Sequence, residues 1–164
     1  MKPYPIAGKN ESAFISNLSL VDEDLTLVFI EKVLVSPPDT DIFAYRFTMN
    51  HTASGQAMGG INIKAGYTEN IRMYRGNIGF TVSEVHRGHH YSARSCQLLI
   101  PVLQWLGLDP IYLTCNVDNF ASKKNIERLG AGFIEEVIIP KTSPYFSYYP
   151  EGSRRKLRFK WKVM

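Results

Sequence analysis

The sequence has few cysteines and no long apolar run. Its two cysteines, Cys96 and Cys115, do not form a CxxC pair, so nothing supports structural zinc or a redox motif, and we expect reduced thiols. No apolar segment approaches the roughly 18 residues that a membrane-spanning helix needs. The N-terminal MKPYPIAGKNESAF lacks the apolar stretch of a secretory signal. We therefore expect a cytoplasmic protein with no membrane partner.

The composition is that of one globular domain. Of the 164 residues, 45 % are apolar and 21 % are charged, which are ordinary values for a soluble protein long enough to bury a core. The sequence shows no repeat, linker or low-complexity segment. We predict a single domain over residues 1–164.

The excess of positive charge lies at the C-terminal end. The formal net charge is +4, and six of the nineteen lysines and arginines fall in SRRKLRFKWKVM. There, Leu157, Phe159 and Trp161 alternate with basic residues, which is the pattern of a half-buried strand. We interpret the lysines as the solvated face of an edge strand, where they discourage pairing with other chains, and do not expect nucleic acid as a partner.

The first half of the chain has the pattern of successive strands. Segments rich in aliphatic and β-branched residues are separated by turn signals such as SPPDTD and TASGQ. The predicted strands span residues 25–35, 42–50, 57–66 and 76–83. Such a succession favours an antiparallel meander. Residues 91–106 then predict a long buried helix, which Pro101 should kink and Gly107 should end.

Strands and helices alternate in the rest of the chain. A strand over residues 111–117 precedes a helix over 119–130, which Asn119 caps and Gly130 ends. A strand over 131–140 and the basic tail follow. This order makes the crossover between the fourth and fifth strands parallel and right-handed. We therefore predict an α/β (α+β) fold with helices on a mixed sheet.

The stretch RGHHYSARS, residues 87–95, joins the fourth strand to the long helix. Unpaired N–H groups at such a turn point outward, and the helix dipole favours negative charge there. The spacing fits neither a GxxxxGK[ST] loop nor a GxGxxG fingerprint. An anion site is one interpretation and an ordinary capped turn is another. His86, His89 and His90 suggest a metal site, but no other cluster completes a ligand set, so we expect no metal.

The same stretch resembles the pyrophosphate-binding signature of the Gcn5-related N-acetyltransferase (GNAT) family, Q/R-x-x-G-x-G/A. Residues 82–93, VSEVHRGHHYSA, match its lead-in, its arginine at Arg87 and the glycine that follows. They depart from it at His90, where the signature has glycine, and at Ser92, where it has glycine or alanine. Serine is small enough for a phosphate to approach, and histidine is enriched at positive φ.

A second segment, YLTCNVDNFASKKNIERLGAGF, resembles the family pattern N-x-x-A/S-x-x-x-x-x-x-x-G. Asn119, Ser122 and Gly130 are in register with it, and the segment is similar to the branch that includes the ribosomal-protein N-terminal acetyltransferases. The resemblance implies the GNAT fold. This is a central, twisted, mixed and mostly antiparallel sheet of about seven strands with helices packed on it, in which strands four and five are parallel and splayed.

The resemblance further implies that acetyl-CoA is the co-substrate. The loop after the fourth strand would bind its diphosphate, and the opened edge of that strand would pair with pantetheine. Lys123 and Lys124 would approach the 3′-phosphate or form a solvated face. The residues implied for the coenzyme are Phe80, Thr81, Val82, Arg87, Gly88, His89, His90, Tyr91, Ser92, Ala93, Asn119 and Ser122.

The implied reaction is direct attack of a primary amine on the thioester in a ternary complex. A backbone N–H near Val82 would polarise the thioester carbonyl. Glu84 is the first candidate for general base, with His86 behind it. Because Ile126 replaces the tyrosine acid usual in the family, Ser122 is the candidate acid, or the thiolate leaves unassisted.

The acceptor stays open among small molecules, protein N-termini and lysine side chains. Deprotonation at pH 7 costs about 4.6 kcal/mol for a lysine and about 1.4 kcal/mol for an α-amino group, so a base matters more for the first. The aromatic loops GYTENIRMYRG and SPYFSYYPEG could wall an acceptor pocket or pack on the sheet. We expect Cys115 in the core and not as a nucleophile. A homodimer, and an acyl-CoA-binding module without catalysis, are the alternatives for assembly and function.

Overall fold

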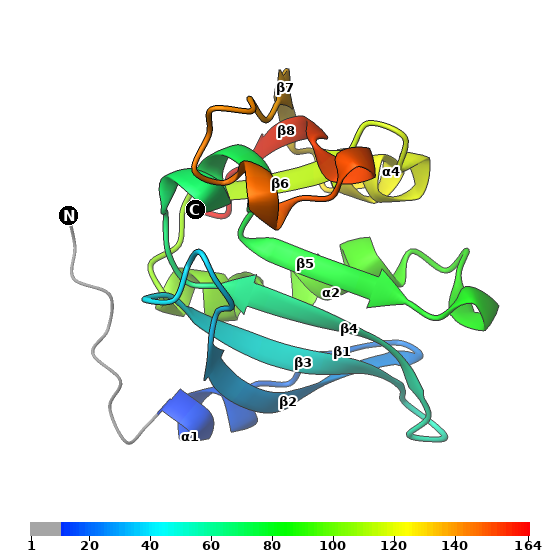
Figure 1. Cartoon of the computed structure of the whole chain (residues 1–164). Helices are drawn as coiled ribbons and strands as arrows, with labels where there is room; N and C mark the ends of the chain where they lie inside the picture. The colour runs from blue at the N-terminus through cyan, green and yellow to red at the C-terminus, as the bar shows by residue number, and fades with distance from the viewer. Residues whose placement is uncertain (1–10) are drawn as a thin grey trace.

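The computed structural model describes residues 11–164, whose strands form two sheets. The first sheet has the order β1-β2-β3-β4-β5 and the second has the order β6-β8-β7 (Figure 1). The strands of the first sheet are β1 (Val21–Asp22), β2 (Leu25–Leu34), β3 (Phe43–His51), β4 (Ala57–Lys64) and β5 (Ile78–Val82). Those of the second are β6 (Ile111–Asn116), β7 (Gly132–Ile138) and β8 (Arg155–Trp161).

Helices and single turns connect these strands. The α-helices are α1 (Glu11–Ser16), α2 (Tyr91–Leu98), α3 (Ile100–Trp105) and α4 (Phe120–Arg128). The shorter elements are the π-helix η1 (Ile71–Arg75) and the 3-10 turns η2 (Glu84–His86), η3 (Phe146–Tyr148) and η4 (Glu151–Ser153). None of the helices among residues 11–164 has the length and apolar character that a bilayer crossing requires.

The predicted meander of the first half is confirmed as β2 to β5. These strands pair antiparallel in sequence order. The two-residue β1 is an addition that the sequence pattern did not show. Gly59 lets β4 and β5 come close, because a Cβ atom at that position would overlap the carbonyl oxygen of Thr81.

The single mixed sheet expected from the sequence is instead two sheets with eight strands. β5 and β6 meet near their beginnings, where the Asn77 amide donates to the carbonyl oxygen of Tyr112 over 2.7 Å and the Tyr112 amide donates to Asn77 Oδ1 over 2.8 Å. Each strand then completes its ladder in its own sheet, β5 with β4 and β6 with β8. The α+β class holds, and the parallel, splayed pairing of the fourth and fifth predicted strands is not confirmed.

The basic tail forms β8, which is the central strand of the second sheet, so the prediction of an edge strand is wrong. β6 pairs with one side of β8 and β7 with the other. Lys156 and Arg158 are buried rather than solvated. Arg158 donates to the backbone oxygen of Arg72 over 2.8 Å and to Glu135 over 2.6 Å. Such tertiary partners are invisible in an alternation of apolar and basic residues.

The predicted long helix is interrupted at Leu99 and forms two helices, α2 and α3. Pro101 lies in the first turn of α3. Proline has no N–H group to continue the helical ladder and is tolerated in a first turn. Gly107 follows α3 with a positive φ of 69°, as predicted for its end. The cap of α4 is also confirmed, since Asn119 Oδ1 accepts from the Ser122 amide over 3.1 Å.

The hydrophobic core lies between the first sheet and the helices, and continues under one face of the second sheet. Met49, Met58 and Ile63 from the strands are fully buried, as are Leu103 from α3 and Leu99 between α2 and α3. Both cysteines belong to this core as free thiols. Burial raises the pKa of Cys115 to about 11, which keeps this thiol protonated near neutral pH.

Candidate functional site

A pocket of about 780 Å³ opens where the end of β5, the loop that follows it and helix α4 come together. Most residues that the sequence implied for the coenzyme line this pocket. They are Phe80, Thr81, Val82, Arg87, Gly88, His90, Tyr91, Ser92, Asn119 and Ser122. The structure therefore brings together two segments that lie some thirty positions apart in the chain. Their role toward a ligand stays a prediction.

Two of the residues implied for the coenzyme, His89 and Ala93, do not line the pocket, and neither does the candidate base Glu84. His89 is exposed and its ring lies 5.3 Å from that of Tyr91. The Ala93 side chain is buried in the core, and its amide donates to Asn125 Oδ1 over 3.3 Å. Glu84 is exposed on the turn η2, whereas its neighbour His86 reaches the pocket wall.

Helix α4 contributes pocket residues that the sequence analysis missed or left undecided. Ala121, Lys124, Asn125 and Arg128 line the pocket from one face of the helix, and Glu127 adds a carboxylate. Their spacing of three and four positions is the signal that could have found them. Lys123 is not among the pocket residues, and its ammonium lies 3.8 Å from a carboxylate oxygen of Glu127.

Two residues of the loop before α2 have positive φ angles, a conformation that glycine adopts most readily. His90 has a φ of 60° and a ψ of 27°, so it takes the left-handed conformation at the place where the family signature has glycine. Gly88 also has a positive φ, of 93°. The departure at His90 thus leaves the loop geometry possible, in agreement with the tolerance of histidine for positive φ. The first helical hydrogen bond runs from the Arg94 amide to the His90 carbonyl oxygen, so the amides of Tyr91 and Ser92 have no acceptor within the helix, while the Ala93 amide donates to Asn125.

The start of α2 is held in place by two carboxylates from the first hairpin. The Tyr91 hydroxyl donates to Asp24 over 2.5 Å, and the Arg94 guanidinium donates to Asp22 over 2.6 Å and to Asp24 over 2.8 Å. The hydrogen bond from Tyr91, followed by that from Arg94, lowers the pKa of Asp24 to about 2. These contacts fix the helix terminus that faces the pocket.

β5 is the edge strand of the first sheet and presents backbone groups to the pocket side. Ser83 donates its amide to Met58 over 2.8 Å, and pairing alternates along an antiparallel ladder. The N–H and C=O groups of Phe80 and Val82 therefore point away from β4. Arg87 Nε donates to the Val82 carbonyl oxygen over 3.1 Å, which sets the arginine beside this open edge.

The aromatic loops lie on the opposite face of the strands. Tyr74 packs edge-on against Tyr145 and Tyr149, with ring centroids 6.1 Å apart in both pairs. The Tyr149 hydroxyl donates to Asn70 Oδ1 over 2.6 Å. These three rings pack on the protein and do not line the coenzyme pocket, and the role of the loops toward an acceptor stays a prediction.

Lys64 is a buried lysine on that same face. Its ammonium donates to Asn62 Oδ1 over 2.9 Å, and no carboxylate of residues 11–164 forms an ion pair with it. Burial is the main cause that lowers the pKa of Lys64 to about 7, with a further contribution from Arg75 that Asp39 opposes. A buried charge of this kind is costly unless another group neutralises it.

Replacing Lys64 by methionine is expected to stabilise the fold at about pH 6 by about 1–2 kcal/mol, because it removes the buried charge and keeps an apolar stem. The pKa of Lys64 is about 7 in the folded chain, below the ordinary value of 10.5. The unfolded chain therefore binds more protons between these values, so the penalty is complete below about pH 7 and disappears as the pH rises toward 10. Urea unfolding of both proteins at several pH values measures the difference. A gap that widens with pH would contradict this assignment.

A metal ion would need a cluster of side chains that could bind it. Residues 11–164 contain no group of three or more histidine, cysteine, aspartate or glutamate side chains that could hold a metal ion. The three histidines of the turn η2 and its following loop do not form such a group.

Comparison with known proteins shows that this chain is similar in fold to several solved structures. No protein-family model matches the chain, and no curated protein matches its sequence. Among solved structures, RimL, a ribosomal L7/L12 α-N-protein acetyltransferase in its apo form, superposes with a TM-score of 0.55 and 18 % identity over 73 % of this chain and 70 % of that chain. A ribosomal-protein-S5-alanine acetyltransferase from Vibrio fischeri gives 0.56 and 15 %, over 73 % and 62 %.

A third similar structure contains the coenzyme. The microcin C7 self-immunity acetyltransferase MccE, in complex with acetyl-CoA and AMP, superposes with a TM-score of 0.55 and 16 % identity over 73 % of this chain and 61 % of its own. Two of these three matches thus cover less than two thirds of the known protein. The chain has the fold of GNAT acetyltransferases, as the resemblance of its two motifs implied.

Proposed function

We propose that this protein is an N-acetyltransferase that transfers the acetyl group of acetyl-CoA to a primary amine by direct attack in a ternary complex. The observation that carries the proposal is the pocket at the end of β5. It combines an open strand edge, a loop with left-handed residues before a helix N-terminus, and a capped second helix. As parts of the same proposal, the chain acts in the cytoplasm as one domain over residues 1–164, as a monomer or homodimer, without metal or nucleic acid.

The pocket suits a coenzyme with a diphosphate and a 3′-phosphate. Arg87, Lys124 and Arg128 supply positive charge along its wall, and the first amides of α2 supply donors for an anion. Phe80 and Val82 offer backbone groups that a pantetheine amide can pair with, in the space beyond the contact of Asn77 with Tyr112. We propose this space as the splay between strands that the resemblance implied.

The bound coenzyme supplies an activated acetyl group as its thioester. The Val82 amide is directed away from β4, where it can donate to a carbonyl oxygen that gains negative charge. We propose Glu84 as the base that takes the proton of the amine and Ser122 as the acid near the departing sulfur. Residues of a 3-10 turn point in directions about 120° apart, so Glu84 is free to face the acceptor while His86 faces the pocket.

Release of free thiol from acetyl-CoA, with a panel of primary amines, tests the proposed function. We expect turnover with at least one class of amine and none without an acceptor. The panel includes amino acids, polyamines, lysine peptides and peptides with free N-termini. Tight binding of coenzyme A with no turnover on any amine would indicate a binding module instead, and absence of coenzyme binding would refute the site itself.

A further inference from the structure

The face of the strands opposite to the helices carries buried positive charge. Lys64 lies on β4, Arg75 at the end of η1 and Lys156 on β8. We call these three residues the front cations. Lys64 and Lys156 are 6 % and 8 % exposed. Arg75 is tied to Asp39 over 3.2 Å, whereas among residues 11–164 neither lysine is paired with a carboxylate.

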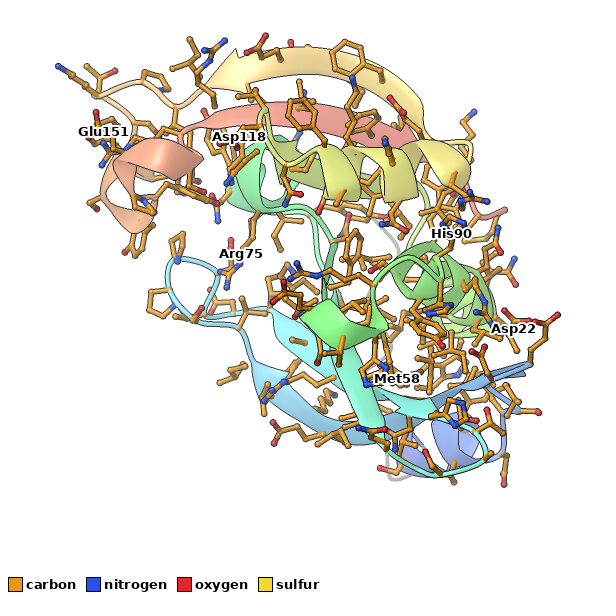
Figure 2. The ribbon with its side chains drawn as sticks, turned by 90° about the vertical axis from the view of Figure 1, so that its right-hand side faces the viewer. Asp22, Met58, Arg75, His90, Asp118 and Glu151 are labelled. Atoms are coloured by element: carbon orange, nitrogen blue, oxygen red, sulfur yellow. The ribbon has the colours of Figure 1, made fainter. Side chains whose placement is uncertain are left out.

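A chain of contacts connects Lys156 with Arg75, and Lys64 interacts electrostatically with Arg75 and Asp39. The Lys156 ammonium lies 5.1 Å from the centre of the Tyr149 ring, and the Tyr149 hydroxyl donates to Asn70, which in turn donates to Asp39 over 2.8 Å. Asp39 accepts from Arg75. Figure 2 shows Arg75 on the side of Glu151, across the view from His90 of the coenzyme pocket.

Both lysines flank the strands at which acetyl transfer is proposed. The Lys64 ammonium lies 3.5 Å from the position of a Cβ atom at Gly79, one residue before the pocket residue Phe80. The Lys156 ammonium donates to Asn116 Oδ1 over 2.7 Å, at the end of β6 and three residues before Asn119. Side chains alternate along a strand, and Phe80 packs on the core side, so Gly79 and Lys64 face the other side.

The coenzyme pocket is lined mainly by the loop after β5 and by helix α4, with Thr81 of β5 on the side of Gly79. An amine that approaches the edge of β5 from the side of Gly79 passes the front cations. There lie Lys64 and Lys156, two buried lysines that form no ion pair with a carboxylate of the described residues 11–164. Burial lowers the pKa of both lysines, because desolvation disfavours the charged form, and a bound anion would offset this effect.

We propose that the acceptor is a small amine that carries a carboxylate or phosphate group, which the front cations bind. This inference rests on the proposed function and narrows its substrate class. The anion balances the charge of the front cations and orients the neutral amine toward the thioester. An uncharged amine of the same shape would leave Lys64 and Lys156 uncompensated in the complex. Peptide N-termini without a nearby anionic group fit this face less well.

Matched pairs of acceptors test the proposal on the whole protein. Thiol release is measured with free amino acids against their amides, and with O-phosphoethanolamine against ethanolamine. A neutral peptide amide is a further acceptor. Rates are expressed per neutral amine, since loss of the anionic group also changes the amine pKa. We expect kcat/KM to be at least about tenfold higher for the charged member of one pair, and the pair that shows it identifies carboxylate or phosphate.

Single lysine substitutions test whether the front cations cause the preference for a charged acceptor. Lys156→Met and Lys64→Met should reduce the preference for the charged acceptor about tenfold and leave coenzyme A binding unchanged. Lys160→Met, which removes an exposed lysine from the same strand β8, is the matched control and should keep the preference. Equal or faster acetylation of uncharged amines or of the peptide amide would overturn the inference and leave the proposed function standing. So would a preference unchanged in both variants. Coenzyme binding without turnover on any amine would overturn both.

Discussion

Replacement of Arg87 by glutamate is expected to weaken coenzyme A binding about 100-fold. The change removes one charge-assisted hydrogen bond to the diphosphate and adds repulsion. It also breaks the contact of Arg87 Nε with the Val82 carbonyl oxygen, which sets the arginine beside the open strand edge. Isothermal titration with coenzyme A measures the dissociation constant, and the difference from wild type should shrink as salt concentration rises.

A second arginine serves as control for this substitution. Arg72 lies exposed on η1, outside the pocket, so Arg72→Glu makes the same change of net charge at a distance. It should alter the dissociation constant less than about threefold, because screened surface charges act weakly over such separations. Equal losses in the two variants would show that overall charge, and not the loop after β5, governs the affinity.

The largest effect on the chemical step is expected from Glu84→Gln. General-base catalysis typically contributes about 100-fold or more, and the amide keeps the shape of the side chain while losing its basicity. We expect kcat at pH 7 to fall about 100-fold with saturating coenzyme, and the loss to be larger for acceptors of higher pKa. His86→Gln should change kcat less and act mainly on the KM for acetyl-CoA, since His86 lines the pocket. The reverse ranking would move the base to His86.

The sequence predicted the elements of the first half well because each strand carries its own signal. Aliphatic runs interrupted by SPPDTD and TASGQ define β2 to β5, and a loop with Arg87 before a helix is the basis of the predicted anion site. The two ends of α4 are likewise predicted from Asn119 and Gly130, because their roles at the helix ends depend only on residues nearby in the chain. These features depend on neighbours in the chain, which is why periodicity and turn residues reveal them.

The rest depends on contacts between distant residues. Whether the tail becomes an edge or a central strand is decided by β6 and β7, which pair with β8 from both sides. Lys156 and Arg158 are buried because Asn116, Ser153 and Glu135 meet them across the fold. The same holds for the wall that α4 adds to the pocket, whose Arg128 lies far from Arg87 in sequence. Such partners carry no local signal.

A crystal structure with coenzyme A bound tests the central claim most directly. The account predicts the diphosphate within about 3 Å of the amides between Gly88 and Ser92, beside Arg87, with pantetheine paired to the outer edge of β5. A coenzyme whose diphosphate lies elsewhere on the protein, or crystals in which the loop contacts no phosphate at saturating coenzyme, would contradict it.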